Sequence, residues 1–404
     1  MEFALIGKSL SHSCSRELHG VLGDYNYSHI ELEPQELEPF FLRRDFKGVN
    51  VTIPYKRDVL AFCDSLSDRA EKIGAVNTVL KTDDGKLFGD NTDYSGFLYS
   101  CRRAGIELKG EKVLILGSGG ASLTVQAVAK DQGAAQITVL KRDDYANITP
   151  YARHTVLVNC TPVGMYPNVF DRPLVSLADF PDCIGVADLI YNPLNTLLLQ
   201  DAAARGITHT NGLAMLAAQA KYAADSFTGK TMPDEVIEKA MGQLVKTRQN
   251  IVLIGMPACG KSTVGKRLAR RLGLQFMDGD EEIVRREGRT IPQIFEQSGE
   301  EAFRALESAV LLDICKTGGQ VISTGGGAVL AEENRRAMHL NGWLVWLQRD
   351  IAELTTTGRP LSASAEAIEK LWKIRQPIYG ALADVTAMNS DLEKCTEEII
   401  CKLS

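Results

Sequence analysis

Short runs of hydrophobic residues alternate with longer amphipathic stretches along almost the whole chain. The runs are typical of buried β-strands and lie at residues 3–7, 28–32, 48–53, 75–80, 112–117, 136–140, 155–160, 184–190, 250–255, 320–325 and 342–347. The stretches between them favour helices, so the alternation predicts α/β layers with parallel sheets. Two of the predicted strands, 112–117 and 250–255, run directly into glycine-rich turns followed by helix-like sequence. Each is therefore expected to be the first strand of its own doubly wound unit.

Length and composition narrow the class of protein. The 404 residues are too many for one compact core and favour two or three domains. A net charge of −6 gives no reason to expect nucleic-acid or anionic-membrane binding. The amino terminus shows no signal-peptide pattern, and no stretch reaches the roughly 20 apolar residues that span a bilayer. Nine cysteines, never spaced as CxxC, indicate reduced thiols in a cytoplasmic chain, most of them in the core.

The sequence GMPACGKS at 255–262 matches the phosphate-binding pattern GxxxxGK[ST], between a predicted strand and an amphipathic helix. Its glycines let backbone N–H groups point at phosphate oxygens, Lys261 reaches the terminal phosphates, and the Ser262 hydroxyl can bind Mg²⁺. A chance glycine loop is the less favoured alternative. The predicted nucleotide-binding residues here are Gly255, Ala258, Cys259, Gly260, Lys261, Ser262 and Thr263.

Several further motifs follow this loop in order. Asp278 and Asp280 lie two apart, so both project from one face if the segment is extended. After them come IFEQSGEEAFRALE, the glycine run STGGGAV and GRPL. With these motifs, residues 249–404 resemble shikimate kinase over their full length. The resemblance implies a P-loop α/β domain, similar to nucleoside monophosphate kinases, that uses ATP and Mg²⁺.

The resemblance also implies residue roles in this second half. Asp280 would bind the shikimate hydroxyls and accept the proton of the attacking one, while Asp278 would help Ser262 hold Mg²⁺ through water. Arg304 and Arg375 would bind the substrate carboxylate, to which a guanidinium fork is suited. The remaining implied residues are Gly325, Gly326 and Gly327 beside the substrate, Phe295 and Phe303 along its ring, and Arg359 on the phosphates from a closing lid.

Each of these residues has a simpler interpretation when taken alone. An Arg near Glu307 on a helix is usually a surface ion pair, and an Asp pair after a strand is more often a turn or a cap. Their joint order outweighs those alternatives. The predicted lid, 353–364, is shorter than in the family and lacks the additional Arg that the family often places against adenine.

The first half carries a dinucleotide-type turn, KVLILGSGGAS, at 112–122. Gly117, Gly119, Gly120 and Ala121 would bring the cofactor pyrophosphate to a helix N-terminus. The next strand ends in Lys141-Arg142, a basic pair that suits the 2′-phosphate of NADP. Asp143 and Asp144 follow at once, so the choice between NADP and NAD stays open on these residues.

A second set of motifs surrounds that turn: HSCS at 12–15, NVTIPYK at 50–56, GAVNT at 74–78, GDNTD at 89–93, NCTPVGM at 159–165 and NGLAMLAAQA at 211–220. In this order and spacing they resemble shikimate dehydrogenase across residues 1–242. The resemblance implies a catalytic pair of Lys56 and Asp93. A lone Lys in such a place is more often a solvated side chain, and the surrounding motifs reverse that preference. The implied substrate-binding residues are Ser13, Ser15, Thr52, Asn77, Asp93, Tyr191 and Gln219, and the implied NADP-binding residues include Arg142, Thr161, Met165 and Gly212.

We therefore predict a two-lobed dehydrogenase followed by the kinase domain. Residues 1–105 with 211–242 would form the substrate-binding lobe, 106–210 a Rossmann-like NADP lobe, 243–249 a polar linker without a core pattern, and 250–404 the kinase domain. The chain would reduce 3-dehydroshikimate with NADPH and then phosphorylate the shikimate formed. Two alternatives remain, a ligand sensor with these folds and an NAD-linked quinate oxidoreductase. The expected partners are small-molecule substrates, and the sequence leaves the oligomeric state open.

Overall fold

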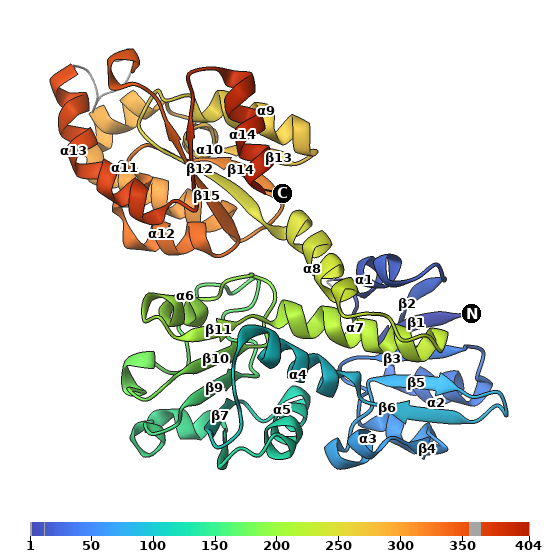
Figure 1. The fold of residues 1–404 in the computed structure, drawn as a ribbon. Helices are drawn as coiled ribbons and strands as arrows, with labels where there is room; N and C mark the ends of the chain where they lie inside the picture. Colours follow the sequence, from blue (N-terminus) through green and yellow to red (C-terminus); the bar gives the residue numbers. More distant parts are fainter. Residues whose placement is uncertain (1, 12, 355–364, 404) are drawn as a thin grey trace. The chain divides into compact units, whose positions relative to one another are not determined.

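The computed structural model describes residues 2–11, 13–354 and 365–403. They form two compact units (Figure 1). The first unit runs to Asn192 and includes Thr196–Val245; the second includes Pro193–Asn195 and begins again at Lys246. Within the described residues, no helix combines the length and the apolar character needed to cross a membrane.

The first unit opens with a six-stranded mixed sheet. Its order is β2 (Tyr27–Glu31), β1 (Phe3–Gly7), β3 (Gly48–Val51), β5 (Thr78–Lys81), β6 (Leu87–Asp90) and β4 (Ser65–Leu66). All residues of β1 and β3 are buried, as expected for apolar strands covered on both faces. Helices α1 (Ser15–Leu22), α2 (Pro34–Arg43) and α3 (Asp68–Ile73) connect these strands.

A second, all-parallel sheet follows in the same unit. Its order is β11 (Thr208–Thr210), β10 (Gly185–Asp188), β9 (Val156–Asn159), β7 (Lys112–Leu116) and β8 (Gln136–Leu140). Helices α5 (Gly120–Asp131) and α6 (Leu197–Ala204) belong to this layer. The strand order reverses beside β7, and ligands of open α/β sheets bind at the carboxyl ends of strands at such a switch point.

Two helices link the two sheets of the first unit. α4 (Thr92–Ala104) leaves the first sheet, and α7 (Gly212–Thr228) leaves the second and packs along α4 (Figure 1). Gly96 permits this close approach, because a Cβ there would lie 2.6 Å from the Met215 carbonyl oxygen and 3.0 Å from Gln219 Cβ. The close packing fixes the first turn of α4 beside the middle of α7.

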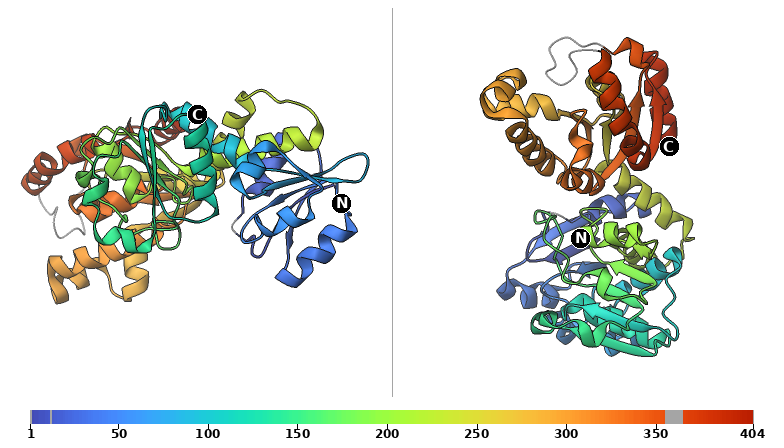
Figure 2. Two further views of the ribbon diagram at one scale, coloured as in Figure 1. Left: turned by 90° about the horizontal axis from the view of Figure 1, so that it is seen from below. Right: turned by 90° about the vertical axis from the view of Figure 1, so that its left-hand side faces the viewer.

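The second unit contains a five-stranded, all-parallel sheet. Its order is β13 (Gln275–Asp278), β14 (Gln320–Ser323), β12 (Asn250–Ile254), β15 (Gly342–Gln348) and β16 (Val385–Met388). Helices α9 (Lys261–Leu272) and α14 (Leu392–Leu403) pack together on one face, and α11 (Ile291–Ile314) and α12 (Glu332–His339) lie together on the other (Figure 2). Helices α10 (Gly279–Glu287) and α13 (Ala365–Leu382) complete the unit.

The structure confirms all eleven predicted strands with ends that differ by at most three residues, and it corrects two details. The first sheet is not purely parallel, because β5 pairs antiparallel with both β3 and β6. The segment 243–249 lies mostly inside helix α8 (Glu235–Arg248), and it does have a core position, since Leu244 is 1% exposed. Short strands such as β4, β11 and β16 gave no hydrophobic run long enough to notice.

Candidate active sites

Lys56 and Asp93 form an ion pair in the first unit. Lys56 Nζ lies 2.6 Å from Asp93 Oδ2, and the side chains are 26% and 12% exposed. Lys56 follows β3, and its backbone is fixed because Val76 N–H donates to the Lys56 carbonyl at 2.7 Å. Asp93 stands in the first turn of α4. A lysine held beside a carboxylate and partly shielded from water can donate a proton to a bound carbonyl.

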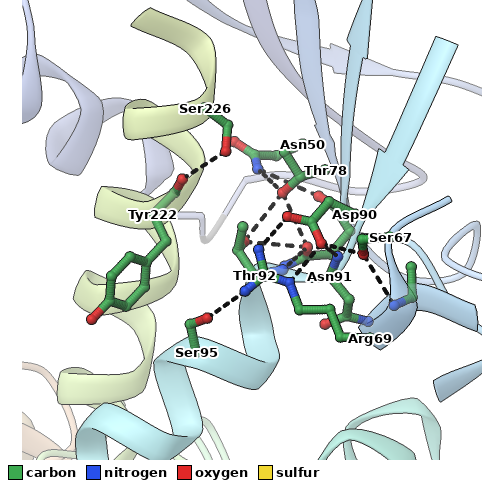
Figure 3. A network of polar contacts seen from close by, with 12 residues as sticks. Asn50, Ser67, Arg69, Thr78, Asp90, Asn91, Thr92, Ser95, Tyr222 and Ser226 are labelled. Carbon is green, nitrogen blue, oxygen red and sulfur yellow. Dashed lines mark hydrogen bonds and ion pairs between the residues drawn. The ribbon is translucent and has the colours of Figure 1, made fainter. Parts of the chain in front are cut away.

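Asn77 lies beside this pair and is held in one orientation. Its Oδ1 accepts hydrogen bonds from Thr92 N–H at 2.7 Å and from the Thr78 hydroxyl at 3.0 Å. Thr78 in turn accepts from Asn50 Nδ2 at 3.0 Å, as the contacts around Thr78 in Figure 3 show. These two donors fix the orientation of the Asn77 amide. Asn77 N–H also binds the Asp90 carbonyl at 3.0 Å, which ties β5 to the start of α4.

The predicted carboxylate-binding serines are also close to each other. Ser13 Oγ lies 3.1 Å from Ser15 Oγ, and Ser15 is the first residue of α1. Three other predicted substrate residues come from different elements of the first unit. Thr52 is four residues before Lys56 and receives backbone support from β1, since Thr52 N–H donates to the Ile6 carbonyl at 2.9 Å. Gln219 packs against Gly96 on α4, and Tyr191 is half-buried just beyond β10.

The glycine turn of the second sheet lies at the carboxyl end of β7. Gly117 adopts a φ of 98°, which only glycine adopts readily. A Cβ at Gly117 would lie 2.7 Å from Thr161 Cγ2, so the two loops that are expected to bind NADP touch here. Gly119 is the N-cap of α5 and Gly120 its first residue. A Cβ at either position would have no atom from elsewhere in the described chain within 4 Å, so space is open in front of this helix end. Ala121 is the second residue of that helix.

The Thr161 loop is anchored by a buried carboxyl group. Asn159 Oδ1 accepts from the Thr161 hydroxyl at 2.7 Å, and Asn159 Nδ2 donates to Asp188 Oδ1 at 2.9 Å. The Thr196 hydroxyl donates to Asp188 Oδ2 at 2.7 Å. Asp188 is 1% exposed, and burial raises its pKa to about 6 despite these hydrogen bonds. Met165, further along the loop, is 43% exposed.

The predicted 2′-phosphate contact lies at the end of β8. Arg142 is exposed there and opens a short helical turn. Asp143 and Asp144 were the reason that the sequence did not decide between NADP and NAD. Asp144 Oδ2 accepts a hydrogen bond from the Lys141 backbone N–H at 2.6 Å. One of the two acidic neighbours is thereby engaged with the turn itself. Gly212, the first residue of α7, lies so close to β10 that a Cβ would meet the Leu189 carbonyl oxygen at 2.0 Å.

In the second unit the phosphate-binding loop joins β12 to α9. Gly260 adopts a φ of 96°, and Ala258 adopts 65°, an uncommon conformation for a residue with a side chain. Lys261 is folded back over the loop, with Nζ 3.0 Å from the Gly255 carbonyl oxygen and 2.9 Å from that of Met256. Cys259 is buried, and its carbonyl accepts from Asn389 Nδ2 at 2.8 Å. Thr263 is exposed in the first turn of α9.

Ser262 and Asp278 meet at the predicted metal position. Ser262 Oγ donates to Asp278 Oδ2 at 2.6 Å, while Asp278 Oδ1 accepts from Asp280 N–H at 3.0 Å. Hydroxyl and carboxylate oxygens are the ligands that Mg²⁺ prefers, with phosphate and water completing its shell. The residues present therefore fit that ion. Asp280 lies inside α10, so the segment is not extended and the expected two-residue alternation is wrong: helix α10 begins directly after Asp278.

Acidic and basic side chains converge on the glycine run after β14. A Cβ at Gly325 would meet Glu307 Oε1 at 2.2 Å and Asp280 Oδ1 at 3.2 Å. Arg304 Nη1 donates to Glu307 Oε2 at 2.7 Å, and a Cβ at Gly327 would meet the Arg304 guanidinium at 2.5 Å. Because Gly325 and Gly327 have no Cβ, the Glu307 and Arg304 side chains can lie against the backbone here. Glu307 is 3% exposed, and burial raises its pKa.

The remaining predicted kinase residues occupy the same region, with one exception. Arg375 is 3% exposed, burial lowers its pKa, and the nearby charges include Arg304 and Glu307. The rings of Phe295 and Phe303 lie with centroids 4.8 Å apart. Gly326 packs on the phosphate-binding loop, since a Cβ there would meet Pro257 Cδ at 2.6 Å. Arg359 and most of the predicted lid lie outside the described residues.

Family models of known proteins match both the first and the second half of the chain. The model of the shikimate dehydrogenase substrate-binding domain matches residues 5–79, and the shikimate kinase model matches residues 257–404. A shikimate dehydrogenase (NADP(+)) from Caldicellulosiruptor bescii is 37% identical over 250 residues, which cover 54% of this chain and 85% of that protein. The chain belongs to the shikimate dehydrogenase family. It also carries a shikimate kinase domain.

Other members of the shikimate dehydrogenase family support the same assignment. The NADP(+) enzyme of Streptococcus suis is 36% identical over 271 residues, which cover 58% of this chain and 93% of that enzyme. A chorismate mutase/shikimate 5-dehydrogenase fusion protein from Clostridium acetobutylicum matches with a TM-score of 0.56 and 32% identity, over 60% of this chain and 96% of that one. The Thermus thermophilus enzyme in complex with NADP(H) and shikimate matches with a TM-score of 0.54 and 33% identity, over 60% and 99% of the two chains.

Several residues of these dehydrogenase and kinase sites escaped the sequence reasoning. Asp188, Asn159 and Thr196 form the buried network behind the cofactor loop. Asn389 supports the phosphate-binding loop from 130 residues away. Asp188 did carry a signal, an acidic residue inside the apolar run at 184–190. Asn389 carried none, because its role depends on β16 lying beside the loop.

Proposed function

We propose that this chain is a bifunctional enzyme acting twice on one ring carbon. The first unit reduces the C3 carbonyl of 3-dehydroshikimate with NADPH and releases shikimate. The second unit transfers the γ-phosphoryl group of ATP to the C3 oxygen of shikimate. The observation that carries the proposal is that one chain holds both a lysine–carboxylate pair and a hydroxyl–carboxylate pair at the phosphate-binding loop: Lys56 Nζ lies 2.6 Å from Asp93 Oδ2, and Ser262 Oγ lies 2.6 Å from Asp278 Oδ2.

In the reduction, the protein supplies the proton and the orientation. NADPH, when bound, supplies the hydride that the carbonyl carbon accepts. Lys56 donates a proton to the carbonyl oxygen, and the neighbouring Asp93 carboxylate steadies the ammonium group before transfer. Asn77 presents its amide donors to a ring hydroxyl, because its oxygen is already bonded to Thr92 and Thr78. Ser13 and Ser15 bind the ring carboxylate, and Thr52, Tyr191 and Gln219 complete the substrate contacts.

The cofactor is expected to lie along the second sheet. The pyrophosphate would lie on the N-terminus of α5, where Gly119 and Gly120 expose backbone N–H groups. Arg142 is the residue we assign to the 2′-phosphate of NADP, supported by its exposure and by the engagement of Asp144 with the backbone. Thr161, Met165 and Gly212 would contact the rest of the cofactor from the loops that follow β9 and β11.

In the phosphoryl transfer, positioning and charge stabilisation do most of the catalysis. Asp280 accepts the proton of the attacking C3 hydroxyl, and Arg304 and Arg375 hold the ring carboxylate. Lys261 turns from the carbonyls that it now contacts to the β- and γ-phosphates. Ser262 and Asp278 would hold Mg²⁺, which would supply positive charge to offset that of the phosphate oxygens.

We propose that the functional domains follow the boundaries predicted from the sequence: 1–105 with 211–242, 106–210 and 250–404. A cytoplasmic location is part of the proposal, supported by nine cysteines that all lie in the described residues and form no disulfide. The alternative of a sensor without catalysis is disfavoured, because a sensor needs neither a proton donor such as Lys56 nor a phosphoryl-binding lysine such as Lys261.

Two single substitutions test the assignment. Lys56→Ala lowers the dehydrogenase kcat by about 10²–10⁴-fold, the contribution of a general acid, and leaves phosphorylation of supplied shikimate unchanged. Lys261→Ala abolishes phosphorylation and leaves the reduction unchanged, so each variant is the control for the other. The reduction of 3-dehydroshikimate is measured at steady state with NADPH and with NADH, and the reverse oxidation with shikimate and with quinate. Phosphorylation is measured with ATP and shikimate. Loss of both activities in a folded Lys56→Ala protein, or faster NAD-linked oxidation of quinate, would contradict the proposal.

A further inference from the structure

We propose that Arg69 is a positioning residue of the dehydrogenase site: it holds the buried Asp90 carboxylate and thereby fixes the first turn of α4, which carries Asp93. The inference rests on the dehydrogenase function proposed for the first unit. Arg69 itself is assigned no contact with the substrate or the cofactor.

Asp90 is the last residue of β6 and is 4% exposed. Its carboxylate is fully engaged (Figure 3). Arg69 Nε donates to Oδ1 at 2.6 Å, and Arg69 Nη2 donates to Oδ2. The Ser67 hydroxyl donates to Oδ1 at 2.5 Å, and the Asn91 N–H does so at 2.7 Å. The fork of Arg69 therefore binds both oxygens, a geometry that a lysine does not reproduce.

Arg69 reaches past Asp90 into α4 itself. Its Nη1 donates to the Ser95 hydroxyl at 2.7 Å. Asp90 lies three residues before Asp93, and Ser95 lies two residues after it, so one guanidinium holds the chain on both sides of the catalytic carboxylate. Because Arg69 comes from α3, it braces the start of α4 against a neighbouring helix.

The same contact also reaches Asn77. The Asp90 carbonyl accepts from Asn77 N–H at 3.0 Å, and Asn77 Oδ1 accepts from Thr92 N–H at 2.7 Å. A displacement of Asp90 would therefore move Asn77 together with Asp93. Lys56 Nζ lies only 2.6 Å from Asp93, a distance that a small shift of α4 would lengthen.

The electrostatics make such a displacement the expected result of losing Arg69. Burial alone would raise the pKa of Asp90, but the hydrogen bonds from Arg69 and Ser67 outweigh it and lower the pKa. Removing one partner of a buried ion pair leaves an uncompensated charge that is costly to keep out of water. The Asp90 carboxylate would then move toward solvent and pull the start of α4 with it.

The test compares Arg69→Met with a control on the same helix. Lys72→Met removes another α3 ion pair, between Lys72 Nζ and Asp131 Oδ2 at 3.4 Å, in which Lys72 is 60% exposed. We expect Arg69→Met to lower the dehydrogenase kcat by about 10- to 100-fold, as a misplaced catalytic group does. The KM for NADPH should stay within about twofold of the wild type, since the cofactor loops are untouched. Lys72→Met should leave kcat unchanged.

Two further variants separate positioning from simple loss of stability. Arg69→Lys restores a positive charge without the fork and should recover part of kcat. Asp90→Asn in the Arg69→Met background removes the unpaired charge and should recover most of it. If Arg69→Met does not fold, these two variants carry the test. Phosphorylation of shikimate by the same preparations is the internal control and should not change.

The outcomes separate this inference from the function on which it rests. A wild-type chain that fails to reduce 3-dehydroshikimate defeats the proposed function. An active wild-type chain whose Arg69→Met variant keeps kcat within about twofold, or whose Lys72→Met variant loses as much, overturns the role of Arg69 alone. If neither Arg69→Lys nor the double variant recovers any of the lost kcat, the proposed role of Arg69 is overturned as well.

Discussion

The Asp188 carboxyl group shows how one buried side chain can join two functional loops. It accepts from Asn159, which orients Thr161, and from Thr196 at the start of α6. Ile190 N–H also donates to it at 3.1 Å, one residue before Tyr191. A single carboxyl group therefore supports residues assigned to both the cofactor and the substrate.

Titration of Asp188 predicts a pH-dependent stability difference. Burial raises its pKa from 3.8 to about 6, so the folded protein binds a proton more tightly than the unfolded chain. The resulting stabilisation is present below pH 3.8 and is lost as the pH rises through about 6. Relative to Asp188→Asn, which cannot titrate, the wild type should lose about 2 kcal/mol of unfolding free energy between pH 4 and pH 7.

Calorimetric unfolding of both proteins across that range measures this difference. The transition of the first unit can be recognised because NADPH should shift it. Curves that stay parallel from pH 4 to pH 7 would show that the pKa of Asp188 is not raised.

At the scale of elements, the phosphate-binding loop carries local strain. Ala258 adopts a φ of 65°, a conformation that costs a residue with a Cβ about 1–2 kcal/mol. The loop is held in this shape by its neighbours, since Asn389 donates to the Cys259 carbonyl and Gly326 packs on Pro257. Tertiary contacts therefore impose a backbone conformation that the local sequence does not favour.

Ala258→Gly should relieve this strain and raise the unfolding free energy of the second unit by about 1 kcal/mol. Urea unfolding followed by tryptophan fluorescence reports on this unit alone, because all three tryptophans of the chain, Trp343, Trp346 and Trp372, belong to it. Gly260→Ala is the matched control: it has a φ of 96°, and its Cβ would lie 2.3 Å from Asn389 Nδ2, so it should destabilise. An unchanged or lower urea midpoint for Ala258→Gly would contradict this account of the loop.

The helix that carries Arg304 illustrates where local patterns mislead. On sequence alone, Arg304 and Glu307 fit an exposed ion pair one turn apart on a helix. In the structure Glu307 is 3% exposed and lies beside Gly325 and Asp280. Burial of this pair depends on α10 packing against α11 and on the glycine run after β14, which no spacing within α11 predicts.

At the scale of the whole molecule, the apolar runs predicted eleven of the strands in the three sheets and missed β4, β6, β11, β13 and β16. The motifs predicted candidate residues for each site. Lys56 and Asp93, 37 residues apart, do form an ion pair. The supporting contacts could not be predicted. Arg69 with Asp90, Asp188 with Asn159, and Asn389 with the phosphate-binding loop join side chains whose neighbours in sequence carry no matching pattern.

The central claim is that both units act on the same carbon and oxygen of one ring. The most direct measurement incubates the intact chain with 3-dehydroshikimate, NADPH deuterated at C4 of the nicotinamide, ATP and Mg²⁺, and follows the products by mass spectrometry. The account predicts shikimate 3-phosphate that carries one deuterium at C3. Deuterated shikimate that accumulates without any phosphorylated product would contradict it.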